Sequence, residues 1–519
     1  MIQSVKYPVG IQDFEKLRTE NYLYVDKTAV LYDLVNTYNY VFLSRPRRFG
    51  KSLMLSTLKA YFEGKKELFE GLAIENLEKD WKKYPVLLLE LSRVNTSDME
   101  SLGALIDQQF RQWEKLYDIN EPGSDLSSRF ADIIIKAHKV TGERVVVLVD
   151  EYDNALINTL KHPELHNRHH TLLKSIYSNL KSMDAHIKFG MLTGVTRFSK
   201  LTIFSGLNNL MDITLDHPYA AICGITEAEL LENFQTGIEQ MADYKGWTVD
   251  QTIEELKKKY DGYHFTQNSP DIYNPFSILN AMAKKELGNY WFSTGIPSFL
   301  VDRMKEGDTD LAKFMNRQVD ELVLKEIDSA RNSTLATLFQ AGFLTIKDYD
   351  EEWEQYTLGI PNEEVCHGMS ALFMEYFLYP DRSEGQSYII SLLKAAKAGE
   401  PEEFLQTLQK FLSGVPFDLS KGNKEVYFHN AFYIISSLIG LKTKAECHTA
   451  TGSIDLLIEN DRFVYIIELK LDRSAREALK QIEEKKYAGP FEGQHRKIFK
   501  IGVNFSSEER NITEWLIGE

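Results

Sequence analysis

RPRRFGKS, residues 45–52, is the stretch that decides the fold of the first half of the chain. Loops that bind nucleotide phosphates read G-x-x-x-x-G-K-[ST], and Gly50, Lys51 and Ser52 match this pattern. Arg45 stands where the leading glycine is expected. The stretch is therefore either a phosphate-binding loop with an unusual start or a basic loop that contains GKS by chance.

The flanking sequence has the strand-loop-helix context that such a loop requires. YVFLS, residues 40–44, is apolar and strand-like, and LMLSTLKAYFEG, residues 53–64, carries apolar side chains at helical spacing. Backbone N–H groups at the start of that helix would face the phosphates. We expect Lys51 to reach the β- and γ-phosphate oxygens and Ser52 to hold Mg²⁺.

The other residues of the loop would form a basic rim. The leading glycine of the pattern serves a tight turn, so we expect the side chain of Arg45 to point outwards. Pro46 would stiffen the turn. Arg47 and Arg48 either add charge near the phosphates or are solvated.

A second motif follows a strand that is predicted to be buried on both faces. RVVVLVDEYD, residues 144–153, has five consecutive apolar residues and then Asp150 and Glu151 at its carboxyl end. Asp150 would order Mg²⁺ through water, and Glu151 would activate the attacking water.

A third strand lies within HIKFGMLTGVTRFSK, residues 186–200, and ends in the polar residues Thr193, Thr196 and Arg197. These residues are candidates for sensing the γ-phosphate, and Arg197 for stabilising transferred charge. Acidic residues after a buried strand also cap loops in unrelated α/β folds. The three elements in this order nevertheless favour a nucleotide site.

Residues 5–290 resemble the bacterial AAA-ATPase-like family. The resemblance is carried by YVDKTAVLYDLV, FLSRPRRFGKSLMLSTLKAYFEGKKELFEGLAI, VVVLVDEYDNALI and GVTRFSKLTIFSGLNNLMDITLD. In that family the loop itself reads RPRRFGKS. The resemblance implies a P-loop ATPase core in which Asp26 and Lys27 lie near the nucleotide. The predicted nucleotide-binding residues are Asp26, Lys27, Arg45, Pro46, Arg47, Arg48, Phe49, Gly50, Lys51, Ser52, Leu53, Asp150 and Thr193.

The middle of the chain reads as helices with one β-hairpin. KYDGYHF, residues 259–265, alternates turn residues with aromatic ones before a helix. Residues 336–365 read as a helix end, a strand, an acidic turn and a second strand, which resembles the winged-helix module attached to ATPases of this type. Acids in that turn would repel phosphate and favour a protein-packing role over DNA binding. Residues 366–420 hold two amphipathic stretches, which we expect to form a helical connector.

The second informative stretch is GSIDLLIENDRFVYIIELKLDRS, residues 452–474, which reads as two strands around a turn. Alternation along a strand puts Glu468 and Lys470 on one face, and pairing across the hairpin can bring Asp455 beside them. Two carboxylates that hold Mg²⁺ and a lysine that positions water or stabilises charge suit metal-assisted phosphodiester hydrolysis. A surface hairpin with a salt bridge is the alternative, although an acid in a buried-looking strand is costly unless it is paired or metal-bound.

From EVYFHNAFYIISSLIGL to GVNF, the end of the chain is similar to the PD-(D/E)xK nuclease-like domain. Asp455 and Glu468-x-Lys470 match its core motif, with Ile454 in place of the proline. The resemblance implies that Glu425 is the acid of the first helix, and that Gln481 with Lys485 and Tyr487 matches the helix after the core. The predicted catalytic residues are Glu151, Arg197, Glu425, Asp455, Glu468, Lys470 and Gln481. The predicted metal ligands are Ser52, Asp150, Asp455 and Glu468, with Mn²⁺ as a substitute for Mg²⁺ at the last two.

Length, composition and charge bound the remaining classes. A chain of 519 residues is too long for one core, and 43% hydrophobic with 26% charged residues is typical of a soluble globular protein. With no apolar run or start typical of a membrane span or signal peptide, we expect a cytoplasmic protein without membrane contact. Three distant cysteines predict neither a disulfide framework nor a zinc site. The formal charge of -16 argues against a protein that coats nucleic acid through a uniformly basic surface. Residues 421–519 carry 15 Lys and Arg against 15 Asp and Glu, so this part of the chain would tolerate nucleic acid better than the rest.

We therefore expect an α/β protein with four parts. They are a P-loop AAA-like ATPase domain with a parallel sheet (1–235), a helical lid and winged-helix-like region (236–365), the helical connector (366–420) and a restriction-endonuclease-like α/β domain (421–519). The expected function is ATP-dependent processing of nucleic acid, DNA before RNA, with Mg²⁺. A nucleotide-dependent switch or scaffold whose nuclease-like domain binds without cutting is the chief alternative, and a transposon or defence effector that needs a trigger is another. A homo-oligomer is also compatible with the sequence.

Overall fold

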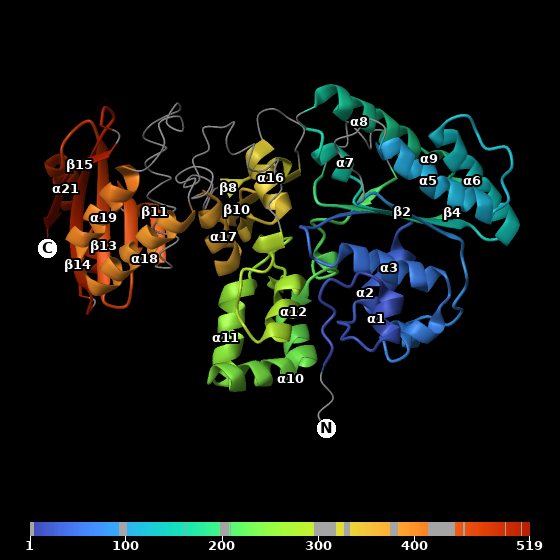
Figure 1. The fold of residues 1–519 in the computed structure, drawn as a ribbon, viewed down its shortest axis with the longest axis horizontal. Coiled ribbons are helices and arrows are strands. Elements are labelled where there is room, and N and C mark those ends of the chain that lie inside the picture. Colours follow the sequence, from blue (N-terminus) through green and yellow to red (C-terminus); the bar gives the residue numbers. More distant parts are fainter. Residues whose placement is uncertain are drawn as a thin grey trace. The chain divides into compact units, whose positions relative to one another are not determined.

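The fold is given by a computed structural model, in which the described residues form two compact units (Figure 1). The first unit reaches to Glu363 and the second begins at Glu364. The described residues are 5–92, 101–160, 162–197, 207, 209–294, 318–325, 333–373, 382–413, 442–449, 452–493, 495–509 and 511–518. Each unit is built around its own β-sheet.

The first unit contains a parallel five-stranded sheet with the order β2-β3-β4-β1-β5, which confirms the predicted fold class. Every residue of β1 is buried, as are the five valine and leucine residues of β3, because helices cover both faces of the sheet. The strands are β1 (Tyr40–Ser44), β2 (Val86–Glu90), β3 (Val145–Asp150), β4 (Ile187–Gly194) and β5 (Met211–Asp212).

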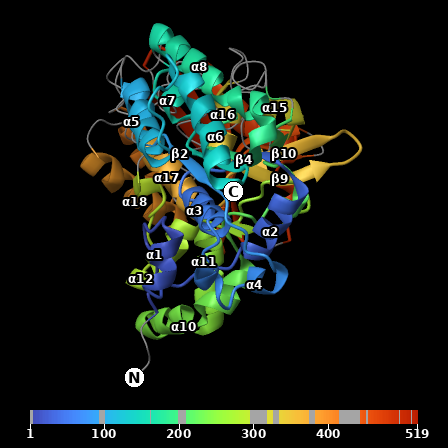
Figure 2. The ribbon, with the colours of Figure 1, turned by 90° about the vertical axis from the view of Figure 1, so that its right-hand side faces the viewer.

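Helices α5, α6 and α8 cover one face of this sheet, and α1, α2 and α3 lie on the other (Figures 1 and 2). On the first face, Phe110 and Phe130 stack with ring centroids 5.3 Å apart and pack into the core that includes Val147. The helices of this part are α1 (Phe14–Thr19), α2 (Thr28–Thr37), α3 (Lys51–Phe62), α4 (Ile74–Leu77), α5 (Ser101–Leu116), α6 (Leu126–Thr141), α7 (Asn154–Ile157), α8 (Pro163–Tyr177) and α9 (Asn179–Ser182).

Three helices after the sheet form a small helical subdomain with its own core. Thr226 and Thr248 each begin a helix with a capping box, in which Glu229 and Gln251 return the hydrogen bond. A short antiparallel pair, β6 (Ile225–Thr226) and β7 (Ile272–Tyr273), joins its ends. The helices are α10 (Glu227–Lys245), α11 (Val249–Tyr260) and α12 (Pro275–Lys284).

The predicted hairpin in the middle of the chain is present. β9 (Thr345–Asp350) and β10 (Gln355–Gly359) pair antiparallel, and β8 (Gln318–Val319) adds to β10. The acidic turn between β9 and β10 carries Trp353, whose surface is 70% exposed. Two helices precede the hairpin, α15 (Glu321–Lys325) and α16 (Ser333–Ala341).

The second unit is a mixed five-stranded sheet in sequential order, parallel only between β13 and β14. Helix α21 packs on one face, and α18 and α19 supply leucine and phenylalanine side chains to the core on the other. The expected helical connector is therefore built into the core of this unit, because its amphipathic helices bury their apolar faces on the sheet. The elements are α17 (Glu363–Phe373), α18 (Arg382–Ala398), α19 (Pro401–Ser413), β11 (Lys442–Thr449), β12 (Gly452–Glu459), β13 (Phe463–Leu471), α21 (Ala475–Glu484), β14 (Lys497–Ser506) and β15 (Asn511–Gly518).

We predict that Gly502→Ala destabilises the second unit by about 1–3 kcal/mol. A Cβ atom at Gly502 of β14 would come within 2.3 Å of the backbone oxygen of Ala475 and 2.6 Å of the backbone nitrogen of Leu479, so α21 would have to move. Urea unfolding followed by hydrogen exchange of the β13–β15 peptides in the full-length protein measures the loss. Gly489→Ala is the control, because no atom of the part of the chain that the structure describes lies within 4 Å of its added Cβ. Equal stability of the two variants would contradict the prediction.

Candidate nucleotide and nuclease sites

The phosphate loop connects the end of β1 to the start of α3, as the sequence predicts. Gly50 is the N-cap of α3 and has φ +96°, a backbone conformation that side chains rarely adopt. No atom of the described residues lies within 4 Å of a Cβ built there, so the backbone angle, and not crowding, requires glycine at this position. The loop therefore exposes backbone at the amino end of a helix, where anions bind.

The ammonium group of Lys51 is buried inside the loop. Its Nζ donates hydrogen bonds to the backbone oxygens of Arg45 at 2.8 Å and Pro46 at 3.0 Å. Burial lowers the pKa of Lys51, while the nearby carboxylates of Asp150 and Glu151 raise it. The lysine thus lies where a phosphate chain would enter the loop.

Asp150 joins the loop to two strands. Its carboxylate accepts a hydrogen bond of 2.6 Å from the Ser52 hydroxyl and one of 2.8 Å from the Thr193 hydroxyl. The parallel order β3-β4-β1 brings the carboxyl ends of these strands to one edge of the sheet. A carboxylate beside a helix-start hydroxyl is a donor set that suits Mg²⁺.

Glu151 follows Asp150 in a left-handed conformation with φ +54°. Burial, and then the charge of Asp150, raises the pKa of its carboxyl group. A carboxyl group with a raised pKa beside a phosphate site is typical of a general base.

Asp153 is a site residue that the sequence reasoning missed. Its carboxylate is buried and accepts hydrogen bonds from the backbone N–H groups of Val195 at 3.1 Å and Thr196 at 2.6 Å, and from the Thr196 hydroxyl at 2.5 Å. The Thr196 hydroxyl, predicted to sense phosphate, is therefore occupied by Asp153. The sequence DEYD, residues 150–153, contains the signal for this role, because its second aspartate, Asp153, reaches the end of the neighbouring strand β4.

Arg197 is engaged within the protein. Its guanidinium forms an ion pair with Asp212, and both side chains are nearly buried. Its backbone N–H donates to the Gln340 side-chain oxygen at 2.7 Å. Any action of Arg197 on a nucleotide would require this ion pair to open.

The prediction that the Arg45 side chain points outwards is wrong. Only 1% of the residue's surface is exposed, because backbone oxygens beyond β5 and the ring of Phe265 enclose the guanidinium. The two arginines that follow Pro46 make other contacts. The backbone oxygen of Arg47 accepts a hydrogen bond from the Trp291 indole at 3.0 Å, and the Arg48 guanidinium lies 4.9 Å from the ring centre of Phe276.

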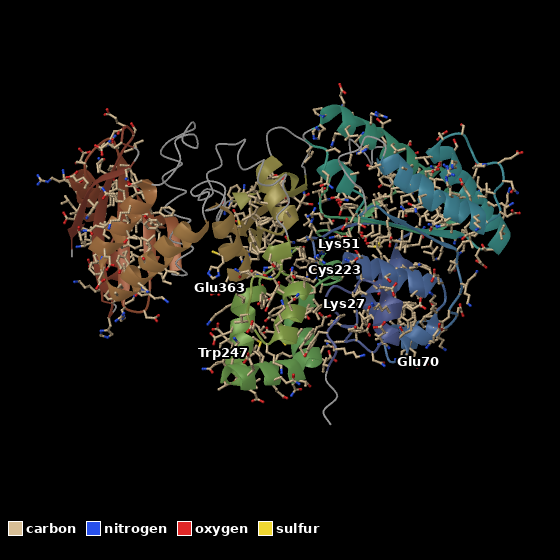
Figure 3. All side chains as sticks on the ribbon, in the orientation of Figure 1. Lys27, Lys51, Glu70, Cys223, Trp247 and Glu363 are labelled. Carbon is tan, nitrogen blue, oxygen red and sulfur yellow. The ribbon has the colours of Figure 1, made fainter. Side chains whose placement is uncertain are left out.

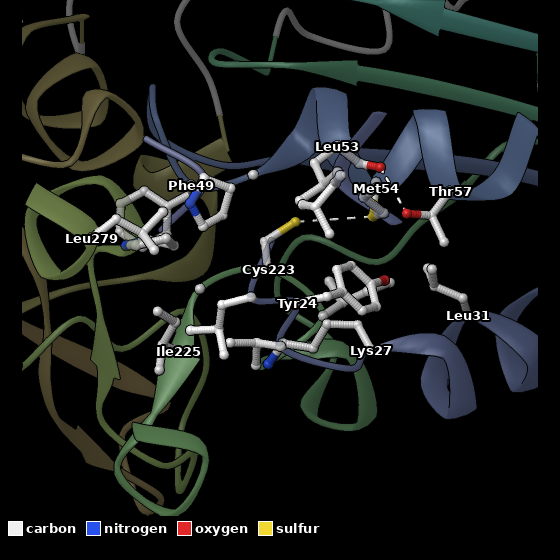
Figure 4. Close-up of a pocket in the computed structure, with 18 of the residues that line it drawn as sticks. Tyr24, Lys27, Leu31, Phe49, Leu53, Met54, Thr57, Cys223, Ile225 and Leu279 are labelled. Carbon is white, nitrogen blue, oxygen red and sulfur yellow. Dashed lines mark hydrogen bonds between the residues drawn. The ribbon is translucent and has the colours of Figure 1, made fainter. Parts of the chain in front are cut away.

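A mostly apolar pocket adjoins the loop in the first unit, with Lys27 on its wall (Figures 3 and 4). Lys27 Nζ pairs with both carboxylate oxygens of Glu229, at 2.6 and 2.7 Å. The preceding Asp26 instead binds the helix start at Thr28 and the N–H of Ala73. Other lining residues include Tyr24, Leu31, Phe49, Gly50, Leu53, Met54, Thr57, Cys223, Ile225 and Leu279.

The predicted nuclease residues come together on β12, β13 and α21. Leu469 N–H donates to Asp455 at 2.8 Å, so the side chain of Asp455 lies across the β13 backbone. Lys470 Nζ donates to Glu468 Oε1 at 3.0 Å, and the Gln481 amide donates to the same oxygen. Tyr487 is buried in the core beside α21, and Glu425 lies outside the described residues.

Glu468 has the properties of a metal ligand. It is 1% exposed, and its second carboxylate oxygen has no hydrogen-bond partner within the described chain. Burial, and then the charge of Asp455, raises its pKa to about 7. An orphaned buried oxygen beside a second carboxylate fits a divalent cation. No group of three or more His, Cys, Asp or Glu side chains suited to a metal occurs among the residues that the structure describes.

Comparison with known proteins matches two regions of the chain to families. Residues 8–204 match a family described as "Predicted AAA-ATPase", and residues 423–515 match the PD-(D/E)XK nuclease superfamily. An "Uncharacterized protein in vnfD 5'region" from Azotobacter chroococcum mcd 1 is 35% identical over 527 residues, covering 99% of this chain and 98% of that protein. The chain belongs to the AAA-ATPase-like family.

This AAA-ATPase-like chain ends in a domain of the PD-(D/E)XK nuclease superfamily. One solved structure, of the Aeropyrum pernix ORC2 protein in ADPNP–ADP complexes, is similar with 12% identity and a TM-score of 0.27, covering 67% of this chain and 93% of that one. Within the described residues, no helix of the AAA-ATPase-like chain has the length and apolar character needed to cross a membrane.

The KYDGYHF segment lies behind the loop and contains a buried acid. The rings of Tyr263 and Phe265 contact that of Phe49, with centroids 4.9 and 5.4 Å away. Asp261 is 3% exposed, so its carboxyl group is shielded from water. Burial raises its pKa to about 6.

We predict that the stability of the first unit falls as the pH rises through about 6, and that Asp261→Asn removes much of this loss. The pKa of Asp261 is higher in the folded state than its ordinary value of 3.8, so the folded protein holds the proton more tightly. The extra stability is present at low pH and disappears when the buried group ionises, by up to about 3 kcal/mol. Unfolding by urea from about pH 4 to about pH 7 measures it, because the loss develops between the ordinary pKa of 3.8 and the folded pKa of about 6. The same pH dependence in wild type and variant would show that Asp261 is not responsible.

Proposed function

We propose that this protein binds and hydrolyses ATP with Mg²⁺ at the RPRRFGKS loop, and that its C-terminal domain cleaves nucleic acid, DNA before RNA. The observation that carries the first half is the position of Asp150. Its carboxylate is hydrogen-bonded to the hydroxyls of Ser52 and Thr193 at the edge of the sheet where the loop lies. Membership of the AAA-ATPase-like family supports the same reading.

In this proposal each residue of the nucleotide site has a defined role. Mg²⁺ would neutralise charge on the β- and γ-phosphates and would be held by Ser52 and, through water, by Asp150. Lys51 would exchange its hydrogen bonds to the loop oxygens for bonds to phosphate. Glu151 would take the proton of the attacking water, since its buried carboxyl group has a raised pKa.

The apolar pocket beside the loop would hold the adenine ring. Its lining combines Gly50 and Leu53 of the loop and of α3 with Lys27 and Ile225 from more distant segments. Apolar pockets with few polar groups are typical of sites for flat organic ligands. The ion pair between Lys27 and Glu229 would hold one wall of this pocket in place.

For the nuclease half, Asp455 and Glu468 would hold Mg²⁺ or Mn²⁺, which polarises the scissile phosphate. Lys470 would position the water or stabilise developing charge, and Gln481 would orient Glu468. The orphaned oxygen of Glu468 is the observation that supports a metal here. In this proposal, ATP binding would regulate the access of nucleic acid to the nuclease-like domain.

A nucleotide-dependent switch is the second candidate function. It is favoured by the ion pair between Arg197 and Asp212, which keeps the predicted charge-stabilising arginine occupied. A switch would bind nucleotide, hydrolyse it slowly and change its oligomeric state without cutting nucleic acid. Comparing turnover with nucleotide-dependent mass in solution separates the two functions.

We predict that Lys51→Ala lowers ATP hydrolysis by about 10²-fold or more, because it removes a charge directed at the transferred phosphate. Glu151→Gln should retain ATP binding and lose hydrolysis to a similar extent, since only the proton acceptor is removed. Phosphate release and nucleotide binding by the full-length protein measure both effects. Lys59→Ala on the exposed side of the same helix is the matched control. Wild-type turnover in Lys51→Ala would refute the ATPase proposal.

We predict that Lys470→Ala and Asp455→Asn each lower cleavage by about 10²-fold or more. The measurement uses linear and circular DNA and single-stranded RNA with Mg²⁺ or Mn²⁺, each with and without ATP. Lys480→Ala on the exposed face of α21 is the matched control, with a side chain 68% exposed. Undiminished cleavage by Lys470→Ala would refute the nuclease proposal. An absence of cleavage by the wild type under all these conditions would favour the switch.

A further inference from the structure

Arg45 is a buried cation that joins four separate segments. Its guanidinium donates hydrogen bonds to the backbone oxygens of Thr214 at 2.8 Å and Tyr219 at 3.1 Å, and lies 4.2 Å from the ring centre of Phe265. Its backbone N–H donates to the oxygen of Gly194 at the end of β4, at 3.2 Å. One residue of the loop is therefore fastened to β4, to the chain beyond β5 and to the KYDGYHF segment.

The charge of Arg45 is balanced by dipoles and not by a carboxylate in direct contact. Every hydrogen bond that its guanidinium makes within the described chain ends on a backbone oxygen. Burial lowers its pKa to about 10, so the group stays protonated at neutral pH. The nearby carboxylate of Asp212 is already paired with Arg197. Among the described residues, this positive charge thus has no carboxylate of its own, and it lies behind the phosphate loop.

The backbone oxygen of Arg45 is also the point where Lys51 rests. Lys51 Nζ donates to that oxygen at 2.8 Å, so the position of the arginine sets the position of the lysine in the loop. Pro46, the other acceptor for Lys51, packs against Gly342, where an added Cβ would lie 2.8 Å from the proline ring. Anchoring Arg45 therefore fixes the part of the loop from which Lys51 must turn towards phosphate.

We propose that Arg45 is the positioning residue of the phosphate loop: its buried guanidinium fixes the loop in place of the missing leading glycine and adds fixed positive charge behind the bound phosphates. The inference rests on the proposed nucleotide site and deepens it. In a glycine-led loop, backbone flexibility lets the chain close around phosphate. In this protein, the hydrogen bonds from the Arg45 side chain to distant segments set the shape of the loop instead. Because the charge attracts every added phosphate, its contribution rises from AMP to ADP to ATP.

The test compares nucleotide affinity in full-length variants by displacement of a fluorescent ADP analogue with ATP, ADP and AMP. Arg45→Met removes the charge and the hydrogen bonds at similar volume, Arg45→Lys keeps the charge but replaces the planar guanidinium with an ammonium group, and Phe265→Leu removes the aromatic face. Phe110→Leu, buried in the core on the α5 side of the sheet, controls for lost stability. Thermal unfolding of every variant is measured alongside.

We expect Arg45→Met to weaken ATP binding by about tenfold or more, since hydrogen bonds from a charged group contribute on this scale. It should weaken AMP binding less, Arg45→Lys should recover part of the ATP affinity, and Phe110→Leu should leave all affinities unchanged. Unchanged ATP affinity in Arg45→Met, equal losses for ATP and AMP, or the same loss in Phe110→Leu would overturn the inference.

If Arg45→Met does not fold, the other two variants decide: wild-type ATP affinity in both Arg45→Lys and Phe265→Leu overturns the inference. A wild-type protein that binds no nucleotide refutes the proposed function, and the inference falls with it. A wild-type protein that binds ATP, with variants that bind equally well, refutes the inference alone.

Discussion

The hydrogen bond from the Ser52 hydroxyl to Asp150 is the contact on which the proposed nucleotide site depends. It ties the start of α3 to the end of β3, two elements that are 98 residues apart in the chain. Thr193 ties the end of β4 to the same carboxylate. These bonds form because β3, β4 and β1 are parallel and follow one another in the sheet, so that their carboxyl ends share one edge.

Much of the fold could be predicted from local patterns. The apolar runs of β1 and β3 are long enough to indicate strands buried on both faces, and the GKS and DE signals mark their carboxyl ends. The alternation in β13 was sufficient to place Glu468 beside Lys470. In each case the chemistry and the local geometry lie within a few residues of one another, so the sequence contains the whole signal.

What could not be predicted depends on contacts between distant segments. The burial of Arg45 requires oxygens from residues 214–220 and the ring of Phe265, and no pattern within the loop announces either. The ion pair of Arg197 with Asp212 and the capture of Thr196 by Asp153 are hidden for the same reason. Helices α18 and α19 were expected to form a connector, because an apolar helix face indicates that the helix packs on another element but does not identify that element.

The burial of Arg45 changes what its motif means. A phosphate loop is usually regarded as a portable element whose glycines carry its shape within eight residues. Here the shape is distributed over the unit, since the side chain of the first position is held by residues 169 to 220 places further along the chain. Replacing Arg45 with the consensus glycine would therefore leave a cavity lined by unpaired carbonyl groups. Likewise, the sequence RPRRFGKS transferred alone into another protein would lack the distant residues that hold its first position.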